Sequence, residues 1–247
     1  MATTRQLQIS FFASGDTNNS AKTSETSIGT ITDNFTQATS SKQPVQKSAG
    51  NAHSSINNAF SSALCDGGDI MSTGTTRSIG GSSSSYSIII AWTNGDYTND
   101  TWLISGTSND AHWGIKAGGA DVIYKANGSK AAAAERDYPT DSTANSTTSY
   151  TFGSDVEMLA ITMDNTIPSL ECFIYNINGE KIADAAAVNN SALGVAFPID
   201  HILGKSDGTL GLDGEILDVI VSNNKVYSQD EIKAFGRRYI GMKDITT

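Results

Sequence analysis

The run Tyr86–Thr93, YSIIIAWT, constrains the fold more than any other segment of the chain. Isoleucine, tyrosine, tryptophan and threonine favour strands, and polar and apolar residues do not alternate along the run. A strand with one face in water would show that alternation, so we expect this strand to be covered on both faces. It ends at Asn94-Gly95, a dipeptide typical of tight hairpin turns. The run therefore predicts a buried strand inside a layered β structure.

Other strand-like runs are separated by Gly, Asn and Asp, as in strands joined by tight turns. The dipeptide Asn178-Gly179 predicts a hairpin, in which Phe173 and Tyr175 share one face and Ile174 lies on the other. Residues 126–150 contain a run of alanines and a Thr/Ser/Asn tract, and we expect a long loop there. The further predicted strands are 101–105, 112–116, 121–125, 156–163, 170–177, 180–183, 199–204 and 211–222.

One helix is predicted after Ser228. Ser228 and Glu231 form a capping-box sequence, in which the serine hydroxyl accepts a hydrogen bond from the Glu231 amide and the glutamate accepts one from the Ser228 amide. Tyr227 and Ile232 stand at the two positions of a hydrophobic staple. Ile232 and Phe235 recur at helical spacing, so we expect one face of the helix to pack on the strands.

Length and composition fit one all-β domain. Sandwiches and barrels of this length often fold as single units, and 247 residues can bury a core without metal or disulfide. Only 17% of the residues are charged, which suits short strands joined by polar turns. We expect residues 31–247 to form the sandwich. Residues 1–30 are expected to form an N-terminal strand or arm that could dock onto a partner.

The net charge of −10 and the pI near 4.6 exclude two classes of partner. Binding through phosphate groups requires clustered Lys and Arg, so we expect neither nucleic acid nor an anionic membrane surface as a partner. The first residues lack the pattern of a secretory signal, and no run approaches the roughly 20 apolar residues of a membrane span. We expect a chain made in the host cytoplasm without a signal peptide and without membrane insertion.

The two cysteines, Cys65 and Cys172, lie far apart in the sequence. A single disulfide could join them, but scattered cysteines are more often free and partly buried. We expect free thiols, and the sequence leaves a Cys65–Cys172 pair open as the alternative.

Two stretches carry a resemblance to a known superfamily. The first, residues 34–73, includes Gln43-Pro44 and the run Cys65–Asp69, CDGGD, in which Cys65 stands where the family usually has Phe. The second, GLDGEILDVIVSNNKVYSQDEIKAFGRRYIG, is a long strand followed by a capped helix. Both are similar to phrases of the concanavalin A-like lectin/glucanase superfamily, in its laminin G-like branch found in phage and bacterial surface proteins. The resemblance implies an antiparallel jelly-roll β-sandwich with one short C-terminal helix. It implies little about function, because this fold carries lectins, hydrolases and scaffolds alike.

The carboxylate pattern of a glycosidase is missing. Retaining glycosidases need two carboxyl groups about 5–5.5 Å apart, which enzymes of this fold place along one strand as Glu-x-Asp-x-Glu or with one more spacer. The only Glu-x-Asp, Glu135-Arg136-Asp137, falls in the predicted loop and is followed by Pro139 and Thr140. Glu215 and Asp218, three apart on a predicted strand, are expected on opposite faces. We therefore expect no catalytic residues and no enzymatic activity.

Calcium is the metal for which the sequence offers candidate ligands. Asp66 with Asp69, and Asp207 with Asp213, supply hard oxygen ligands beside predicted turns. Asp-Gly sequences are also turn formers in their own right. We therefore expect no resident metal or other cofactor, with Ca²⁺ as the alternative.

Tyr97 is the candidate for stacking on a sugar ring. It lies in the predicted loop TNGDYTND, where we expect an exposed aromatic side chain. Trp92, Trp102 and Trp113 fall in predicted strands, so we expect them in the core. Asp207, in a second predicted loop, is the polar residue expected to contribute to the same carbohydrate site.

Three functions remain open from the sequence. The first is a non-enzymatic structural or display protein of a virion, such as a capsid-decoration or fibre component. It would be present in several copies and contact other virion proteins such as a major capsid protein. The alternative is a carbohydrate-binding adhesin module that recognises host or matrix glycans. The third is a lyase or glucanase with an unfamiliar active site.

Overall fold

The computed structural model describes the chain in segments. These are residues 5–10, 24–26, 28–29, 34–48, 61–80, 85–93, 95–106, 112–115, 117, 122–125, 136–138, 156–164, 169–176, 181–185 and 197–239.

Two sheets build the molecule. The nine-stranded sheet contains β1 (Arg5–Ser10), β3 (Ile28–Gly29), β5 (Val45–Lys47), β6 (Ser62–Asp66), β8 (Tyr86–Thr93), β13 (Val156–Asp164), β14 (Ser169–Asn176), β15 (Lys181–Ala185) and β17 (Asp213–Asn223). Its order is β15-β14-β13-β8-β17-β1-β3, with β6 paired to β17 and β5 paired to β6. The eight-stranded sheet contains β2 (Ser24–Thr26), β4 (Asn34–Thr36), β7 (Met71–Ile79), β9 (Thr101–Ser105), β10 (His112–Ile115), β11 (Val122–Lys125), β12 (Arg136–Tyr138) and β16 (Phe197–Ile202). Its order is β12-β11-β10-β9-β16-β7-β4-β2.

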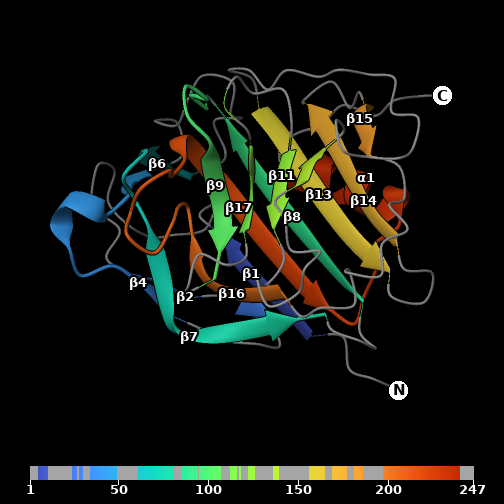
Figure 1. Cartoon of the computed structure of the whole chain (residues 1–247), viewed down its shortest axis with the longest axis horizontal. Helices are drawn as coiled ribbons and strands as arrows, with labels where there is room; N and C mark the ends of the chain where they lie inside the picture. The colour runs from blue at the N-terminus through green and yellow to red at the C-terminus, as the bar shows by residue number, and fades with distance from the viewer. Residues whose placement is uncertain are drawn as a thin grey trace.

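The two sheets lie face to face, with β9 and β11 in front of β8 and β17 in Figure 1. The strand pairs that the structure describes are antiparallel throughout. A short 3₁₀ turn, η2 (Ser40–Lys42), and one α-helix, α1 (Gln229–Tyr239), complete the described elements. This is the all-β, antiparallel β-sandwich with one short C-terminal helix that the sequence predicts.

Strand β8 is buried along its whole length, as its composition predicts. Ile88 and Ile90 point into the core between the sheets. Ile89 and Ala91 point to the opposite face, into a second apolar cluster. The absence of alternation in the sequence thus reflects a strand with apolar neighbours on both sides.

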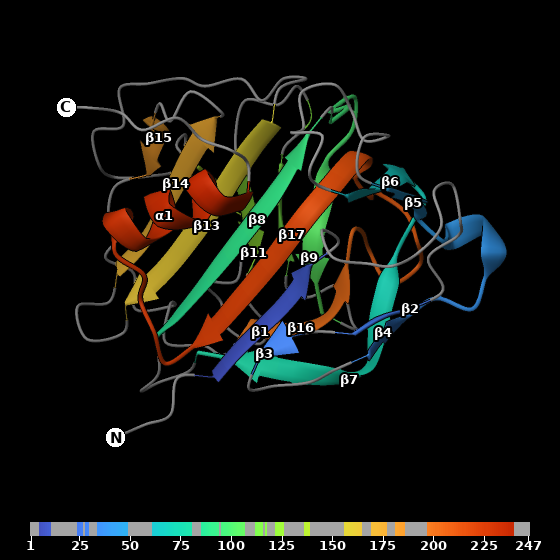
Figure 2. The same ribbon diagram turned by 180° about the vertical axis from the view of Figure 1, so that it is seen from behind.

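Helix α1 covers the outer face of the nine-stranded sheet, across β8, β13 and β14 (Figure 2). The predicted capping box is present, because the Ser228 amide donates to Glu231 Oε2 (2.9 Å) and the Glu231 amide donates to Ser228 Oγ (3.3 Å). Tyr227 and Ile232 are buried in the second cluster, and Phe235 packs against it. These contacts confirm the predicted apolar face of the helix.

The described part of residues 1–30 consists of strands. β1 pairs with β17 over six residues, from Arg5–Asn223 to Ser10–Asp218. β2 pairs with β4 in the other sheet. The expected N-terminal strand is therefore present, whereas docking of this region onto a partner stays a prediction.

Two expectations about connections are wrong. Asn94-Gly95 follows β8 but does not close a hairpin, because β8 pairs with β13 and β17 while β9 lies in the other sheet. Residues 126–150 are not loop throughout, because β12 pairs with β11 through Asp137 and Ile123. In both places tertiary pairing decides a structure that local sequence does not specify. The Asn178-Gly179 hairpin is supported by the pairing of β14 with β15.

Glu215 and Asp218 share one face of the sheet, so the prediction that they face opposite sides is wrong. The register of β17 against β8 shifts between Ile216 and Asp218, which is a β-bulge. Glu215 pairs with Thr93 and Asp218 with Ala91, two residues that lie on the same side of β8. The extra residue of the bulge cancels the offset expected from a spacing of three.

Cys65 is a free, buried thiol, as expected. Burial, followed by the charges of Asp69 and Asp66, raises its pKa well above the usual value, so it remains protonated. The side chain of Cys172 lies outside the described residues. Among the helices that the structure describes, none has the length and apolar character required to span a membrane.

Candidate functional site

Three loops meet at one edge of the sandwich. They are residues 67–70 between β6 and β7, residues 95–100 between β8 and β9, and residues 203–212 between β16 and β17. Backbone hydrogen bonds join the three loops to one another and to the adjoining ends of β9 and β17. They are Gly67 N to Leu212 O (3.0 Å), Gly211 N to Gly67 O (3.0 Å), Asp96 N to Asp213 O (2.8 Å) and Trp102 N to Leu210 O (2.7 Å). These bonds fix the loops relative to one another.

Gly211 lies where two of these loops cross most closely. A Cβ at this position would lie 2.6 Å from Leu203 O and 2.8 Å from Gly67 O. Carbon atoms do not approach backbone oxygens that closely, so a glycine is needed for the loops to come together. The close approach brings Asp66 and Asp213 to the same cavity.

The cavity between the loops has a volume of about 260 Å³. We call it the acidic pocket, because four of the described residues that line it are aspartates. The lining residues are Asp66, Gly67, Asp96, Thr98, Asn99, Asp100, Thr101, Leu210, Gly211 and Asp213. No Lys or Arg is among them. The volume lies slightly below the roughly 300–1,000 Å³ of pockets that hold drug-sized ligands, which suits one small polar group such as a terminal sugar.

Two of the carboxylates, those of Asp66 and Asp96, each use one oxygen to hold their own loop. Asp66 Oδ1 accepts from the Gly68 amide (3.0 Å), and Asp96 Oδ1 accepts from the amide (2.9 Å) and hydroxyl (2.7 Å) of Thr98. The Oδ2 atoms of Asp66 and Asp96, and both carboxylate oxygens of Asp213, accept no hydrogen bond from the part of the chain that the structure describes. The pocket therefore presents hydrogen-bond acceptors on a fixed backbone.

Asp100 completes the acidic lining. Its Oδ1 accepts from the Ala117 amide (2.9 Å), which ties the β8–β9 loop to the turn after β10. The side chains of Asn99 and Thr98 are exposed beside it and add a neutral amide and a hydroxyl to the lining.

The carboxylates are close enough to influence one another's protonation. Burial, followed by the charges of Asp96 and Asp66, raises the pKa of Asp213. Burial, followed by the charge of Asp66, raises the pKa of the neighbouring Asp69 to about 6. Hydrogen bonds from Thr98 lower the pKa of Asp96. The pocket thus concentrates negative charge, and a ligand that donates hydrogen bonds or carries positive charge would relieve the repulsion.

Tyr97 is not the exposed side chain that the sequence predicts. Only 7% of the residue is exposed, and its ring lies in the core between the sheets. The loop TNGDYTND turns its tyrosine inward, because Trp92 and Glu157 offer hydrogen-bond partners to the hydroxyl. Tyr97 therefore has no free ring face on which a sugar could stack.

The three tryptophans are buried, as expected. Trp92 and Trp113 are 0% exposed and Trp102 is 7% exposed. Trp102 stacks on His112 with ring centroids 3.8 Å apart, and Lys205 Nζ lies 5.0 Å from its ring centroid.

Asp207 lies beside the acidic pocket and does not line it. Its Oδ1 accepts from the amide (3.0 Å) and hydroxyl (2.6 Å) of Thr209, and its backbone carbonyl accepts from Lys42 Nζ. Asp207 thus stabilises the β16–β17 loop, part of which forms the pocket. A direct role in sugar binding stays a prediction.

Of the two aspartate pairs considered for calcium, Asp66 and Asp69 lie together, whereas Asp207 and Asp213 do not line the same cavity. Asp69 Oδ2 accepts from the Asp66 amide (3.0 Å), which is the geometry of a turn. Asp213 lies with Asp66 in the acidic pocket and not with Asp207. Among the described residues, no group of three or more His, Cys, Asp or Glu side chains could hold a metal ion. Binding of Ca²⁺ stays a prediction.

The candidate catalytic carboxylates do not form an active site within the described residues. Glu135 lies outside them. Glu215 and Asp218 are only 6% and 2% exposed. Ser62 Oγ donates to Glu215 Oε2 (2.6 Å), which occupies one of its oxygens. Because the described residues bury both side chains, a substrate could not reach this pair.

The sequence reasoning missed the meeting of Asp66, Asp96, Asp100 and Asp213. Two features of the sequence pointed to parts of this pocket. Asp96 and Asp100 lie in the same predicted loop as Tyr97, and Asp66 lies in the CDGGD run that is similar to the superfamily. The register of β6 against β17, which places Asp66 opposite Asp213, follows only from the folded sheet.

Comparison with models of protein families finds no match to this sequence. Comparison with curated proteins likewise finds none. Among solved structures, the CBM40 of a Ruminococcus gnavus IT-sialidase bound to α2,3-sialyllactose is 18% identical, with a TM-score of 0.43 over 62% of this chain and 83% of that chain. A SAP-like pentraxin from Limulus polyphemus is 11% identical, with a TM-score of 0.40 over 64% of this chain and 72% of that chain. The lectin UEA-II complexed with galactose is 9% identical, with a TM-score of 0.39 over 89% and 98% of the two chains.

Proposed function

We propose that the protein is a non-enzymatic carbohydrate-binding module whose acidic pocket binds the hydroxyl groups of a terminal sugar. The observation that carries the proposal is the set of carboxylate oxygens of Asp66, Asp96 and Asp213 that face a small cavity without accepting a hydrogen bond from the described residues. Sugar hydroxyls donate strong hydrogen bonds to carboxylates. The backbone bonds between the loops hold these acceptors in place before a ligand arrives, which lowers the entropic cost of binding.

The charge of the pocket determines the class of sugar. Four aspartates and no described basic residue line it. A sugar that carries a carboxylate, such as sialic acid, would be repelled by these charges. The ligand class that fits is therefore a neutral sugar or an amino sugar with a protonated amine.

Resemblance to the solved structures does not support this proposal by itself. CBM40 and UEA-II are described in complex with sugars, but TM-scores of 0.43 and 0.39 carry no weight for this chain. The virion role expected from the sequence gains no support from the described residues or the comparisons, and it stays a prediction. The proposal rests on the pocket.

The test is a glycan array that includes neutral, amino and sialylated sugars, probed with the wild-type chain and two variants. Asp213→Asn removes one pocket charge and one strong acceptor. Asp230→Asn removes the same charge from an exposed position on α1 and serves as the matched control. A hydrogen bond to a charged group contributes about 1.5–3 kcal/mol, so Asp213→Asn is expected to weaken binding roughly 10- to 100-fold.

Two results would contradict the proposal. One is an array without any bound glycan. The other is a bound glycan whose affinity changes equally in Asp213→Asn and Asp230→Asn. Release of reducing sugar from a bound glycan would overturn the non-enzymatic part alone.

A further inference from the structure

Tyr97 interrupts an exposed loop with a buried side chain. Asp96 and Thr98, on either side of it, are exposed and line the acidic pocket. The Tyr97 ring enters the core between the sheets and is 7% exposed. The loop that carries four of the pocket residues, Asp96, Thr98, Asn99 and Asp100, therefore has an anchor in its middle.

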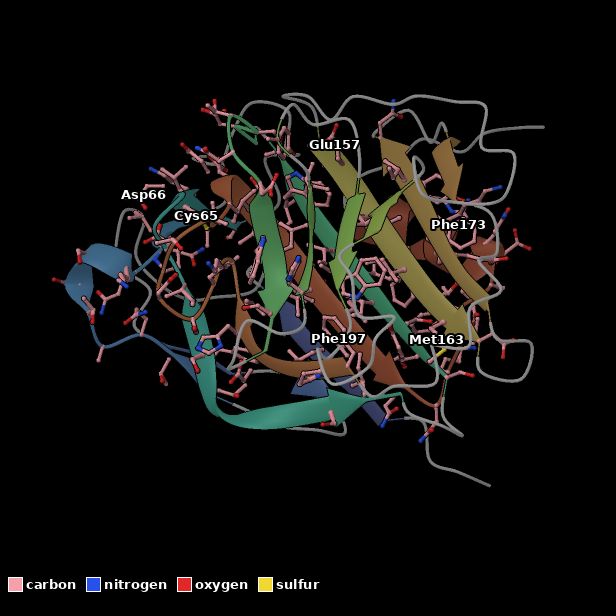
Figure 3. The ribbon with its side chains drawn as sticks, viewed as in Figure 1. Cys65, Asp66, Glu157, Met163, Phe173 and Phe197 are labelled. Atoms are coloured by element: carbon pink, nitrogen blue, oxygen red, sulfur yellow. The ribbon has the colours of Figure 1, made fainter. Side chains whose placement is uncertain are left out.

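Two hydrogen bonds hold that anchor to the nine-stranded sheet. Trp92 Nε1 on β8 donates to the Tyr97 hydroxyl (2.6 Å), and the Tyr97 hydroxyl donates to Glu157 Oε2 on β13 (3.4 Å). Trp92 and Glu157 are both 0% exposed. Figure 3 shows Glu157 towards one end of β13, at the same upper edge of the sandwich as Asp66. A polar contact in such a dry environment is costly to break, because the separated groups would remain buried without these partners.

Gly95, the first residue of the loop, leaves room for the same contact. A Cβ on Gly95 would lie 2.2 Å from the Tyr97 hydroxyl oxygen and 2.4 Å from its Cζ. Only a glycine lets the backbone pass over the end of the tyrosine ring. The inward position of Tyr97 is thus determined by three residues from two strands and the loop itself.

We infer that Tyr97 is a positioning residue, which fixes the β8–β9 loop so that Asp96 and Thr98 face the acidic pocket. Its significance for sugar binding rests on the proposed function. The anchoring of the loop does not, and it is measured separately.

The test compares Tyr97→Phe with the wild-type chain by hydrogen–deuterium exchange. The variant keeps the ring and removes only the hydroxyl. The amides to follow are those of Asp96, which donates to Asp213 O, and Trp102, which donates to Leu210 O. We expect their exchange to accelerate at least tenfold, while the amides of β13 keep their rates. Binding of a glycan identified on the array should weaken by a similar factor.

Tyr227→Phe is the matched control. Tyr227 is also buried (8% exposed), and its hydroxyl donates to Ser222 Oγ (3.3 Å) in the second cluster, beneath α1. Removal of this hydroxyl should leave both the exchange of the β8–β9 loop and glycan binding unchanged.

A second measurement needs no variant. If Tyr97 anchors the loop, the loop can open only when the bond from Trp92 Nε1 breaks. The indole proton of Trp92 and the amide of Asp96 should then show the same protection in the wild-type chain, once each exchange rate is divided by the intrinsic rate of its group. A much less protected Asp96 amide would show that the loop opens while the anchor stays in place, which overturns the inference.

The remaining outcomes are distinguishable. Unchanged loop exchange in a folded Tyr97→Phe variant overturns the inference and leaves the proposed function standing. Faster loop exchange in a protein whose wild-type form binds no glycan supports the anchor and contradicts the proposed function.

Discussion

Asp66 and Asp213 are register partners at adjacent ends of β6 and β17, and both side chains line the acidic pocket. Like charges placed directly opposite on neighbouring strands destabilise a sheet. The charge of Asp66 also contributes to the raised pKa of Asp213. Such an arrangement is typical of a binding site whose residues lower the stability of the unliganded protein.

Asp213→Asn should therefore stabilise the unliganded protein. Because the raised pKa of Asp213 means that its charged form is disfavoured in the folded state, removal of the charge at pH 7 should raise the free energy of unfolding by about 0.2–1 kcal/mol. Urea denaturation measures the change. Asp230→Asn should act in the opposite direction by a few tenths of a kcal/mol, because an acidic residue in the first turn of α1 favours the helix. Destabilisation by Asp213→Asn would contradict the account of the pocket.

Asp69 should make stability fall as the pH rises. Its pKa is raised from 3.8 to about 6 in the folded state, mainly by burial. The folded state therefore holds the proton more tightly than the unfolded state, so this contribution to stability is complete below pH 3.8 and is lost as the pH rises through 6. Asp69→Asn should flatten the dependence of the unfolding free energy between pH 4 and 6. Denaturation curves at several pH values test this, and an unchanged slope in the variant would contradict it.

Gly211→Ala should disrupt the junction of the pocket loops. The new methyl group would meet the backbone oxygens of Leu203 and Gly67, which cannot move without breaking the hydrogen bonds between the loops. We expect a loss of about 1–3 kcal/mol in the free energy of unfolding, together with weaker sugar binding. Gly68→Ala is the control, because its Cβ would lie 3.3 Å from Asp66 Oδ1 and 3.9 Å from Gly208 O, so no backbone atom comes closer than an ordinary contact. Equal losses in the two variants would contradict the proposed crossing.

Ser228→Ala should cost about 1 kcal/mol, because it removes the acceptor for the Glu231 amide at the start of α1. Thermal denaturation measures the loss. Gln229→Ala, at an exposed position one residue later, should change stability by less than about 0.5 kcal/mol. Sugar binding should survive both changes, since α1 covers the outer face of the sheet and does not contribute to the pocket.

The parts of the fold that the sequence predicts well are those decided locally. β8 was recognisable because a strand buried on both faces needs apolar residues at successive positions, and its predicted bounds match the structure. The start of α1 was recognisable because the capping box between Ser228 and Glu231 lies within four residues. Both signals are complete within a short stretch of sequence.

The misjudged features depend on residues far apart in the chain. The bulge that places Glu215 and Asp218 on one face has no local marker, because it is a property of the pairing between β17 and β8. Tyr97 looked exposed because its neighbours are polar, but Trp92 and Glu157 draw it into the core. The acidic pocket needs three separate loops, so a single stretch of sequence could not reveal it.

The most direct test of the central claim compares one neutral oligosaccharide, chosen from the array, with its terminally sialylated derivative by isothermal titration calorimetry. The acidic pocket predicts that the neutral sugar binds and that the sialylated one binds at least tenfold more weakly. It further predicts that Asp213→Asn weakens binding of the neutral sugar while Asp230→Asn does not. Equal or tighter binding of the sialylated sugar would contradict the assignment of carbohydrate binding to this pocket. An affinity for the neutral sugar that does not change in Asp213→Asn would contradict it as well.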